Sequence, residues 1–105
     1  MIARQWRGWT SLKNADAYEA VLRTHTLPEI EKIEGHCACY LLRKDGPAEV
    51  EFIVLNFFDS IEAVKRYAGP DYSVAVFHPE GLALLSRVEP NATHYEVRYS
   101  PERDS

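Results

Sequence analysis

The segment HCACY (36–40) places a histidine directly before both cysteines of the chain, which suggests a metal site or a redox pair. On a β-strand, Cys37 and Cys39 would share one face, with Cα atoms roughly 6.6 Å apart and Cβ atoms side by side, a poor disulfide geometry. His36 would point to the opposite face. A closed zinc site would need ligands from elsewhere, and no other cysteine is present. We therefore expect both cysteines to act as small hydrophobic residues on a strand that is buried on both faces.

Two other histidines could do chemistry. His25 ends an apolar stripe at helical spacing that begins at Tyr18. Facing a cavity, it could act as a base or hydrogen-bond a ligand, and the alternative is a half-buried histidine with an ordinary partner. His78 lies in a break between two short elements, where it could bind a ligand or transfer a proton. A loop histidine without a function is equally consistent with that position.

Arg4 and Asn56 are polar residues on otherwise apolar strands. Arg4 shares a strand face with Trp6 and could hold a substrate anion, although it could also be a surface arginine. Asn56 could orient a ligand carbonyl or O2, and the favoured alternative is a polar link to a helix or a water molecule. His94 and Glu96 share a face of the last strand and could relay protons, but a dimer contact or an edge feature is favoured.

Aromatic residues could line a binding site for a flat molecule. Trp6 and Trp9 lie on the first strand, and Tyr67 and Tyr72 follow the third. Aromatic substrates stack on such side chains. The alternative is that these rings only fill the core.

Apolar patterning predicts the elements that must position these residues. A proline at position 28 should bend or restart the first helix, and Asp59 should cap the second, which ends at Gly69-Pro70. Short helical turns are expected in DYSVAVF and HPEGLALL. The expected strands are 2–9, 36–43, 49–58 and 93–99, and the first helix is expected over 14–26.

The resulting order, β-α-β-β-α-β, predicts an α+β fold with the split βαβ, ferredoxin-like topology. Such a fold has a four-stranded antiparallel sheet with helices on one face. Strands 2–9 and 49–58 carry apolar residues on both faces, so the second face also needs cover. We expect that cover to be a second copy of the chain, in a homodimer whose sheets pack face to face.

Composition indicates a globular protein. The chain has 105 residues and a net charge of −4, which predicts one domain over 1–100, a disordered tail over 101–105, and no binding to nucleic acid or membranes. The longest apolar stretch, FIVLNFF, is too short to span a membrane. The start, MIARQWRGWT, lacks the apolar segment of a signal peptide. We expect a cytoplasmic protein with reduced thiols.

Several segments follow one recurring pattern. They are WRGWT, ADAYEAVL, IEGHCACYLLRK, EFIVLNFFDSIEAVKRYAG, DYSVAVFHPE and the closing HYEV. The most specific cue is a long strand ending in an aromatic residue, followed by a polar cap, Glu-Ala and an aromatic residue before a glycine, here Phe58-Asp59-Ser60, Glu62-Ala63, Tyr67 and Gly69. Over about residues 2–99 the chain resembles the antibiotic biosynthesis monooxygenase family of dimeric α+β barrels. That family more often has tryptophan at the position of Phe58.

The resemblance implies a reaction class. Some members oxygenate aromatic, polyketide-type substrates with O2 and without metal or flavin, so the substrate must be an electron-rich phenol. We therefore expect a cofactor-independent monooxygenase acting on an aromatic, quinol-type or polyketide-type metabolite. The candidate catalytic residues are His25, Asn56, His78 and Arg4, and the candidate substrate-binding residues are Trp6, Tyr18, Phe58, Tyr67 and Tyr72.

The resemblance also leaves two alternatives. A sister branch binds and degrades haem with an asparagine on the first strand, a tryptophan in the second helix and an axial histidine after it. This chain has Trp6-Arg7, Tyr67 and Phe77 at those positions, so only His78, one residue beyond the axial position, supports haem binding. The other alternative is a non-catalytic dimer that binds a metabolite.

Overall fold

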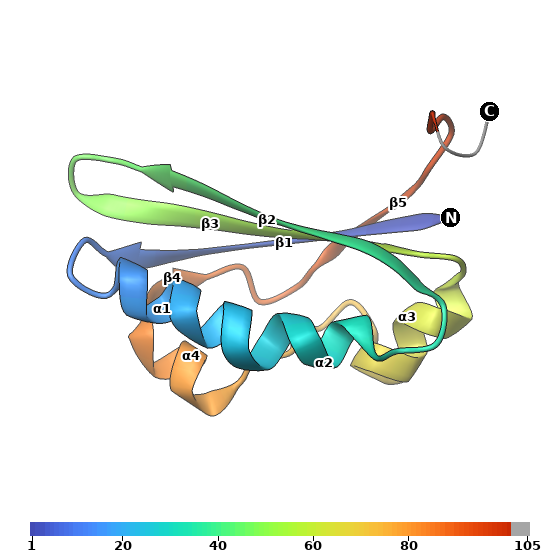
Figure 1. The fold of residues 1–105 in the computed structure, drawn as a ribbon, viewed down its shortest axis with the longest axis horizontal. Coiled ribbons are helices and arrows are strands. Elements are labelled where there is room, and N and C mark those ends of the chain that lie inside the picture. Colours follow the sequence, from blue (N-terminus) through green and yellow to red (C-terminus); the bar gives the residue numbers. More distant parts are fainter. Residues whose placement is uncertain (102–105) are drawn as a thin grey trace.

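The computed structural model describes residues 1–101 and forms one antiparallel sheet with every described helix on the same face (Figure 1). The strand order is β2-β3-β1-β4, and β5 also pairs with β1. This is the expected α+β, ferredoxin-like sheet. In chain order the elements are β1 (Ile2–Ser11), α1 (Ala15–Val21), the π-helical turn η1 (Leu22–Thr26), α2 (Leu27–Glu31), β2 (His36–Asp45), β3 (Glu49–Phe58), α3 (Ile61–Ala68), α4 (Pro79–Leu84), β4 (Leu85–Val88) and β5 (Thr93–Glu96).

Two short strands share the fourth strand position, where the sequence predicts one strand over 93–99 and only an apolar turn before it. β4 pairs with β1 near Gly8–Thr10, and β5 pairs with β1 near Ile2–Gln5. Between them the chain leaves the sheet, where Pro90 has no N–H to donate to a ladder. β4 was therefore missed because its four residues are too few to show an alternating pattern. The tail expected beyond Pro101 lies outside the described residues.

The gap between β4 and β5 is filled by residues 71–78, which we call the roof segment. The amide of Ala92 donates to the carbonyl of Ser73 at 2.7 Å. The amide of Ala75 donates to the carbonyl of Pro90 at 3.0 Å. These backbone bonds hold the roof segment beside the sheet, on the side where the helices lie.

The first helix contains a π-helical turn just before Pro28. The amide of Leu27 donates to the carbonyl of Leu22, and α2 then begins at Leu27. Pro28 has no N–H, and its ring would crowd the carbonyl one turn earlier, so the helix widens there. The sequence predicts a bend or restart at this proline, but Leu27 keeps helical φ and ψ, and the helix continues through the π-helical turn without a break. The wide turn also rotates the residues beside it relative to an ideal helix.

Ser60 caps α3, so the prediction of Asp59 as the cap is wrong by one residue. The Ser60 Oγ accepts a hydrogen bond from the Ala63 amide at 3.2 Å. Asp59 instead accepts a hydrogen bond from the Ser60 hydroxyl at 2.9 Å. Both residue types are good caps, and the sequence pattern alone does not choose between neighbours. α3 ends at Gly69, whose φ of 85° favours glycine.

A bulge at the start of β2 changes the faces of its residues. His36 pairs with Phe58 and Ala38 pairs with Phe57, so Cys37 is an extra residue. Cys37 is exposed, whereas Cys39 is half-buried, and burial raises the pKa of its thiol to about 11. The prediction that both cysteines share a face opposite His36 is wrong, because one extra residue reverses the alternation. Within residues 1–101 both thiols are free, and no cluster of three potential metal ligands is present.

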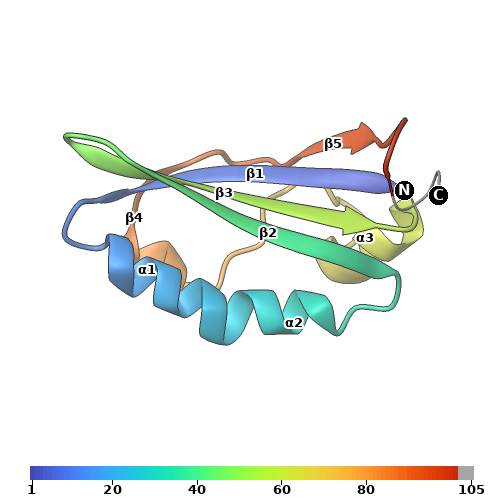
Figure 2. The same ribbon diagram turned by 45° about the horizontal axis from the view of Figure 1, so that its top comes forward.

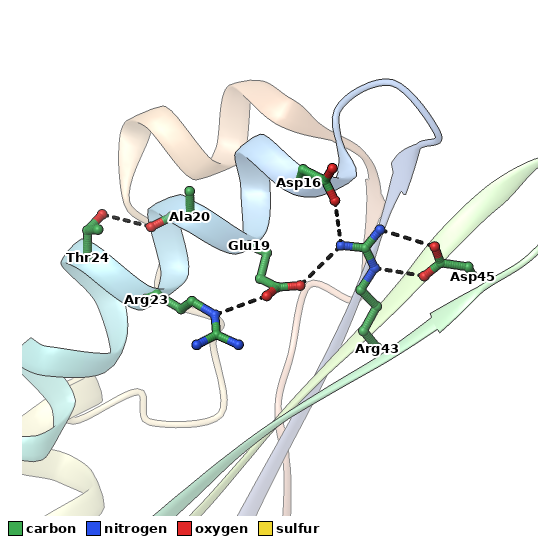
Figure 3. A network of polar contacts seen from close by, with 7 residues as sticks. All are labelled: Asp16, Glu19, Ala20, Arg23, Thr24, Arg43 and Asp45. Atoms are coloured by element: carbon green, nitrogen blue, oxygen red, sulfur yellow. Dashed lines mark hydrogen bonds and ion pairs between the residues drawn. The ribbon is translucent and has the colours of Figure 1, made fainter.

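Arg43 connects α1 to the far end of β2 (Figure 3). Its Nη1 lies 2.8 Å from Asp16 Oδ1 and 3.1 Å from Glu19 Oε1. Its Nε lies 2.7 Å from Asp45 Oδ1. Arg23 extends the network with an ion pair to Glu19 at 2.9 Å. These ion pairs are partly exposed, so each contributes little to stability, but together they fix the direction of α1 over the sheet.

The sheet face opposite the helices carries no helix within the described chain (Figure 2). The β3 side chains Ile53, Leu55 and Phe57 are half-buried there. Tyr40 and Tyr95 are more open, with 52% and 53% of their surface exposed. The prediction of a central strand that is apolar on both faces therefore agrees with β3. Among residues 1–101 no helix is long and apolar enough to cross a membrane.

Candidate functional site

A cavity lies between the sheet, the first helix, α3 and the end of the roof segment. Its volume is about 40 Å³, which is small beside the several hundred Å³ of a typical ligand pocket. As it stands, the cavity has room for water or a small group, and a larger ligand requires the roof segment to move. Apolar and aromatic side chains form most of its wall, and no carboxylate of residues 1–101 lines it. The lining residues are Arg4, Trp6, Tyr18, Leu22, Thr26, Ile30, Val54, Asn56, Tyr67, Val76, Phe77, His78, Gly81 and Leu82.

Arg4 is the charged residue of this cavity, with only 4% of its surface exposed. Its Nη1 donates to the carbonyl of Tyr72, and its Nη2 donates to the carbonyl of Val74 at 3.3 Å. The guanidinium carbon lies 5.5 Å from the centre of the Tyr67 ring. Within residues 1–101 Arg4 forms no ion pair, and burial lowers its pKa. A guanidinium has more N–H donors than these contacts use, so it can also bind an anion.

His94 lies beside Arg4 and must be neutral there. Its Nε2 is 3.0 Å from Arg4 Nη1. A guanidinium only donates hydrogen bonds, so the imidazole Nε2 accepts and the ring proton sits on Nδ1. Burial, and then the nearby charge of Arg4, lower the pKa of His94. His94 therefore orients Arg4 from β5, while the dimer-contact or edge role that the sequence favoured stays a prediction.

Two tyrosines give the cavity hydroxyl groups that stay protonated. Burial raises the pKa of Tyr18, and Tyr67 adds to the shift. Burial also raises the pKa of Tyr67, although Arg4 acts in the opposite direction. Tyr18 packs its ring edge-on against Phe52, with 5.0 Å between centroids. Both hydroxyls are therefore hydrogen-bond donors at neutral pH.

Asn56 is buried on β3 directly opposite Arg4 of β1. Its Oδ1 lies 2.9 Å from Nε2 of His36. The link to His36 replaces the predicted link to a helix or a water molecule. The bulge at Cys37 makes it possible, because it turns His36 toward the helix face of the sheet. Sequence reasoning missed His36 for this reason.

The π-helical turn changes which residue of the first helix faces the cavity. His25 is exposed, and Thr26 lines the cavity in its place. The ideal helical spacing that predicted His25 on the cavity side does not hold across the wide turn. His25 instead stacks on His78, with ring centroids 4.7 Å apart. His78 lines the cavity and caps α4 through its Nδ1, which accepts from the Glu80 amide at 3.2 Å.

Trp6 forms part of the aromatic wall. Its Nε1 donates to the carbonyl of Glu89 at 2.7 Å, and its ring meets the edge of Phe77 at 5.6 Å. The indole lies over Gly8, where an added Cβ would be only 2.3 Å from the ring. Gly8 is therefore needed for this position of Trp6. Trp9 does not join this wall, because its ring stacks under Arg87 at 3.7 Å.

The remaining predicted binding residues lie near the cavity without lining it. Phe58 is fully buried in the core and stacks on Tyr67, with centroids 6.3 Å apart. Tyr72 meets the edge of His94 at 5.0 Å, and its carbonyl accepts from Arg4. The structure thus brings together Arg4, Trp6, Tyr18, Asn56, Tyr67 and His78 at one cavity. It leaves His25, Phe58 and Tyr72 outside the lining.

Comparison with known proteins identifies the fold of this chain. No family model matches the chain, and no curated protein matches it. Among solved structures, a proposed antibiotic biosynthesis monooxygenase from Deinococcus radiodurans is similar, with a TM-score of 0.69, 15% identity and 95% of each chain covered.

Two characterised proteins share the same fold. SnoaB, a cofactor-independent oxygenase from Streptomyces nogalater, has a TM-score of 0.60 and 19% identity, with 95% of this chain and 96% of SnoaB covered. The haem degrader MhuD from Mycobacterium tuberculosis, with two haems in its active site, has a TM-score of 0.60 and 16% identity, with coverage of 95% and 98%. At these identities the likeness establishes the fold. The expected resemblance to antibiotic biosynthesis monooxygenases is confirmed at that level.

Proposed function

We propose that this protein is a cofactor-independent monooxygenase that oxygenates an electron-rich aromatic substrate, bound as its phenolate or enolate anion, with O2. The observation that carries the proposal is the buried guanidinium of Arg4, which has no carboxylate partner within residues 1–101 and lines an aromatic cavity. A buried cation without a counter-charge is costly to the fold. A substrate anion would supply that counter-charge.

The proposed reaction needs no group beyond substrate and O2. In the simplest case a ring C–H next to a phenol becomes a C=O, giving a quinone. One oxygen atom of O2 enters the product, and the other leaves as water with the hydrogens of the C–H and O–H bonds. The phenolate is the electron donor to O2. Arg4 would favour this anion, while the aromatic wall would orient the ring and the closed cavity would exclude water.

The test is O2 uptake by the purified protein with a panel of monohydric electron-rich phenols, naphthols and anthrones, whose conversion to a quinone requires the insertion of one oxygen atom. We expect at least one of them to consume one O2 per substrate and yield the quinone, above the spontaneous rate. The small cavity favours the compact members of the panel. If no electron-rich phenol consumes O2 faster with the protein than without it, the proposal fails.

Haem is the cofactor that the fold could imply, and the residues fit it poorly. His78 lines the cavity, and its Nε2 makes no hydrogen bond within residues 1–101, which is the observation in its favour. However, Tyr67 stands where the haem-degrading branch has tryptophan, and a cavity of about 40 Å³ is far smaller than a porphyrin. We therefore assign no step to haem. A haemin titration without a Soret change in the wild-type protein would support this conclusion, whereas a change lost in His78→Ala would contradict it.

We also propose that the chain acts as a homodimer. The open sheet face supports this, because Ile53, Leu55 and Phe57 form its centre and Tyr40 and Tyr95 flank them. A second copy would cover this apolar surface. Sedimentation should give twice the chain mass, and Phe57→Glu should give a monomer. Lys65→Glu, an exposed change on the helix side, is the matched control and should leave the mass unchanged.

A further inference from the structure

We propose that Arg4 and Asn56 form a two-donor site for the substrate oxyanion, and that His36 is the positioning residue that turns the Asn56 N–H2 group toward it. The inference rests on the proposed function and deepens it, since it names the group that recognises the substrate. It also assigns a role to His36, which does not line the cavity.

The first step is the placement of the two donors. Arg4 and Asn56 are a directly opposed pair on the adjacent strands β1 and β3. Side chains of such a pair leave the sheet on the same face with Cβ atoms about 5 Å apart. Both residues are buried and both line the cavity. Because both side chains line one cavity of about 40 Å³, we infer that an acceptor atom bound in it meets both.

The second step is the orientation of the Asn56 amide. Its Oδ1 is taken by His36 Nε2 at 2.9 Å. The oxygen can only accept, so Nε2 of His36 carries the proton and donates. Within the described residues the amide nitrogen makes no hydrogen bond, so its N–H2 group is available to a ligand. His36 is held in turn by the edge of its ring against Phe58, with 5.3 Å between centroids.

The third step is the chemistry that this arrangement selects. A guanidinium and an amide N–H2 are both donors, so the ligand group between them must be an acceptor. The hydroxyls of Tyr18 and Tyr67 stay protonated and donate as well. Among the described residues, no carboxylate lines the cavity to bind a cation or compete for Arg4. The site therefore fits a phenolate or enolate oxygen, and it disfavours a neutral or cationic ring.

A coloured phenol tests the inference without any turnover. 4-Nitrophenol changes its absorbance when it ionises, and as a single-ring phenol it requires only a small movement of the roof segment to enter. Bound to the wild-type protein, it should ionise at least one pH unit lower than in solution, a tenfold preference for the anion. Failure to bind, or an unshifted ionisation of the bound phenol, would overturn the inference.

Variants at position 36 separate positioning from a merely structural role. His36→Phe removes the donor and should weaken phenolate binding about tenfold, because the amide is free to turn its oxygen toward the anion. His36→Gln keeps an N–H at a similar reach and should restore most of the affinity. Equal binding by His36→Phe and wild type, or equal loss in both variants, would contradict the role of His36.

A measurement on the wild-type protein covers the case in which these variants do not fold. The chain has three asparagines, so the Asn56 side-chain amide can be assigned with selective 15N labelling. Its N–H2 protons should shift downfield when 4-nitrophenolate is added, and those of Asn14 and Asn91 should not. An unmoved Asn56 signal would refute the two-donor site. O2 uptake plays no part in these readouts, so phenolate binding without oxygenation would reject only the proposed reaction.

Discussion

Two arginines of this chain reach the helix face of the sheet and meet opposite surroundings. Arg43, at the outer end of β2, is surrounded by the carboxylates of Asp16, Glu19 and Asp45 (Figure 3). These carboxylates raise its pKa, with the hydrogen bonds that Arg43 donates to Asp45 as the main cause. Arg4, near the start of β1, is almost fully buried, and burial lowers its pKa. Its partners are two backbone carbonyls and the neutral His94.

The difference shows what each position contributes. The charge of Arg43 is neutralised within the protein, so its role in fixing α1 is complete without a ligand. The charge of Arg4 is held by dipoles alone in a place where a cation is disfavoured. Stability alone would favour an apolar residue at position 4. A function that needs a buried positive charge explains why an arginine is there.

The largest effect is expected from removing the buried charge. Arg4→Met should lower the O2-uptake rate about 100-fold, because one donor to the developing anion is lost. Arg4→Lys should retain more activity, since it keeps the charge without the fork of donors. Steady-state rates on the best phenol of the panel measure this, with circular dichroism to confirm folding. An O2-uptake rate for Arg4→Met within twofold of wild type would show that the buried charge is not needed for the reaction. Arg4 and Arg43 would then not differ in function.

A smaller effect is expected from the hydroxyl beneath the buried guanidinium. Tyr67→Phe keeps the ring that faces Arg4 at 5.5 Å and removes only the hydroxyl. We expect about a tenfold loss in substrate binding if that hydroxyl donates to the anion, because the raised pKa of Tyr67 keeps it protonated. Tyr18→Phe provides a comparison on the other wall of the cavity. Unchanged binding in Tyr67→Phe would assign Tyr67 to packing.

The neutral partner of Arg4 predicts a pH dependence. His94 has a lowered pKa in the folded state, so the unfolded chain binds more protons between that value and about 6.5. Stability is therefore complete above about pH 6.5 and falls as the pH decreases toward the folded-state pKa. Thermal melts at pH 7.5, 6.5 and 5.5 should show this fall, and His94→Gln should reduce it. A melting temperature that rises on acidification in the wild type but not in His94→Gln would contradict the sign.

The smallest effect is expected at the exposed arginine. Arg43→Ala should leave turnover within twofold of wild type and lower the melting temperature only slightly, because partly exposed ion pairs are weak. The small loss should shrink further in high salt. If Arg43→Ala instead abolished turnover, the direction of α1 that Arg43 fixes would be required for the reaction. The two arginines would then not differ in the way described above.

Most of the fold was predictable because its strands have strong patterns. β3 carries apolar residues on both faces past Glu51, and β1 mixes aromatic and cationic residues as a central strand does. β4 was missed because four residues show no clear period. The cap of α3 was misplaced because two neighbouring residues are both good caps.

The site was predictable only in part, because its geometry depends on two irregular features. Arg4, Trp6 and Asn56 were placed well, since regular alternation on β1 and β3 sets their directions. His25 was misplaced because a π-helical turn follows from the packing of a whole helix around Pro28. His36 was missed because a bulge depends on pairing between strands, which a local pattern does not contain.

The divided fourth strand has a consequence for how the cavity opens. The roof segment is attached through the gap between β4 and β5 and through the carbonyls that accept from Arg4. It can therefore swing away while the β1–β3 and β2–β3 ladders remain intact. An incoming anion would bind the N–H donors of Arg4 that these carbonyls leave free. Amide hydrogens of the roof should then exchange faster than those of β3, and the cavity would admit larger guests without any melting of the sheet.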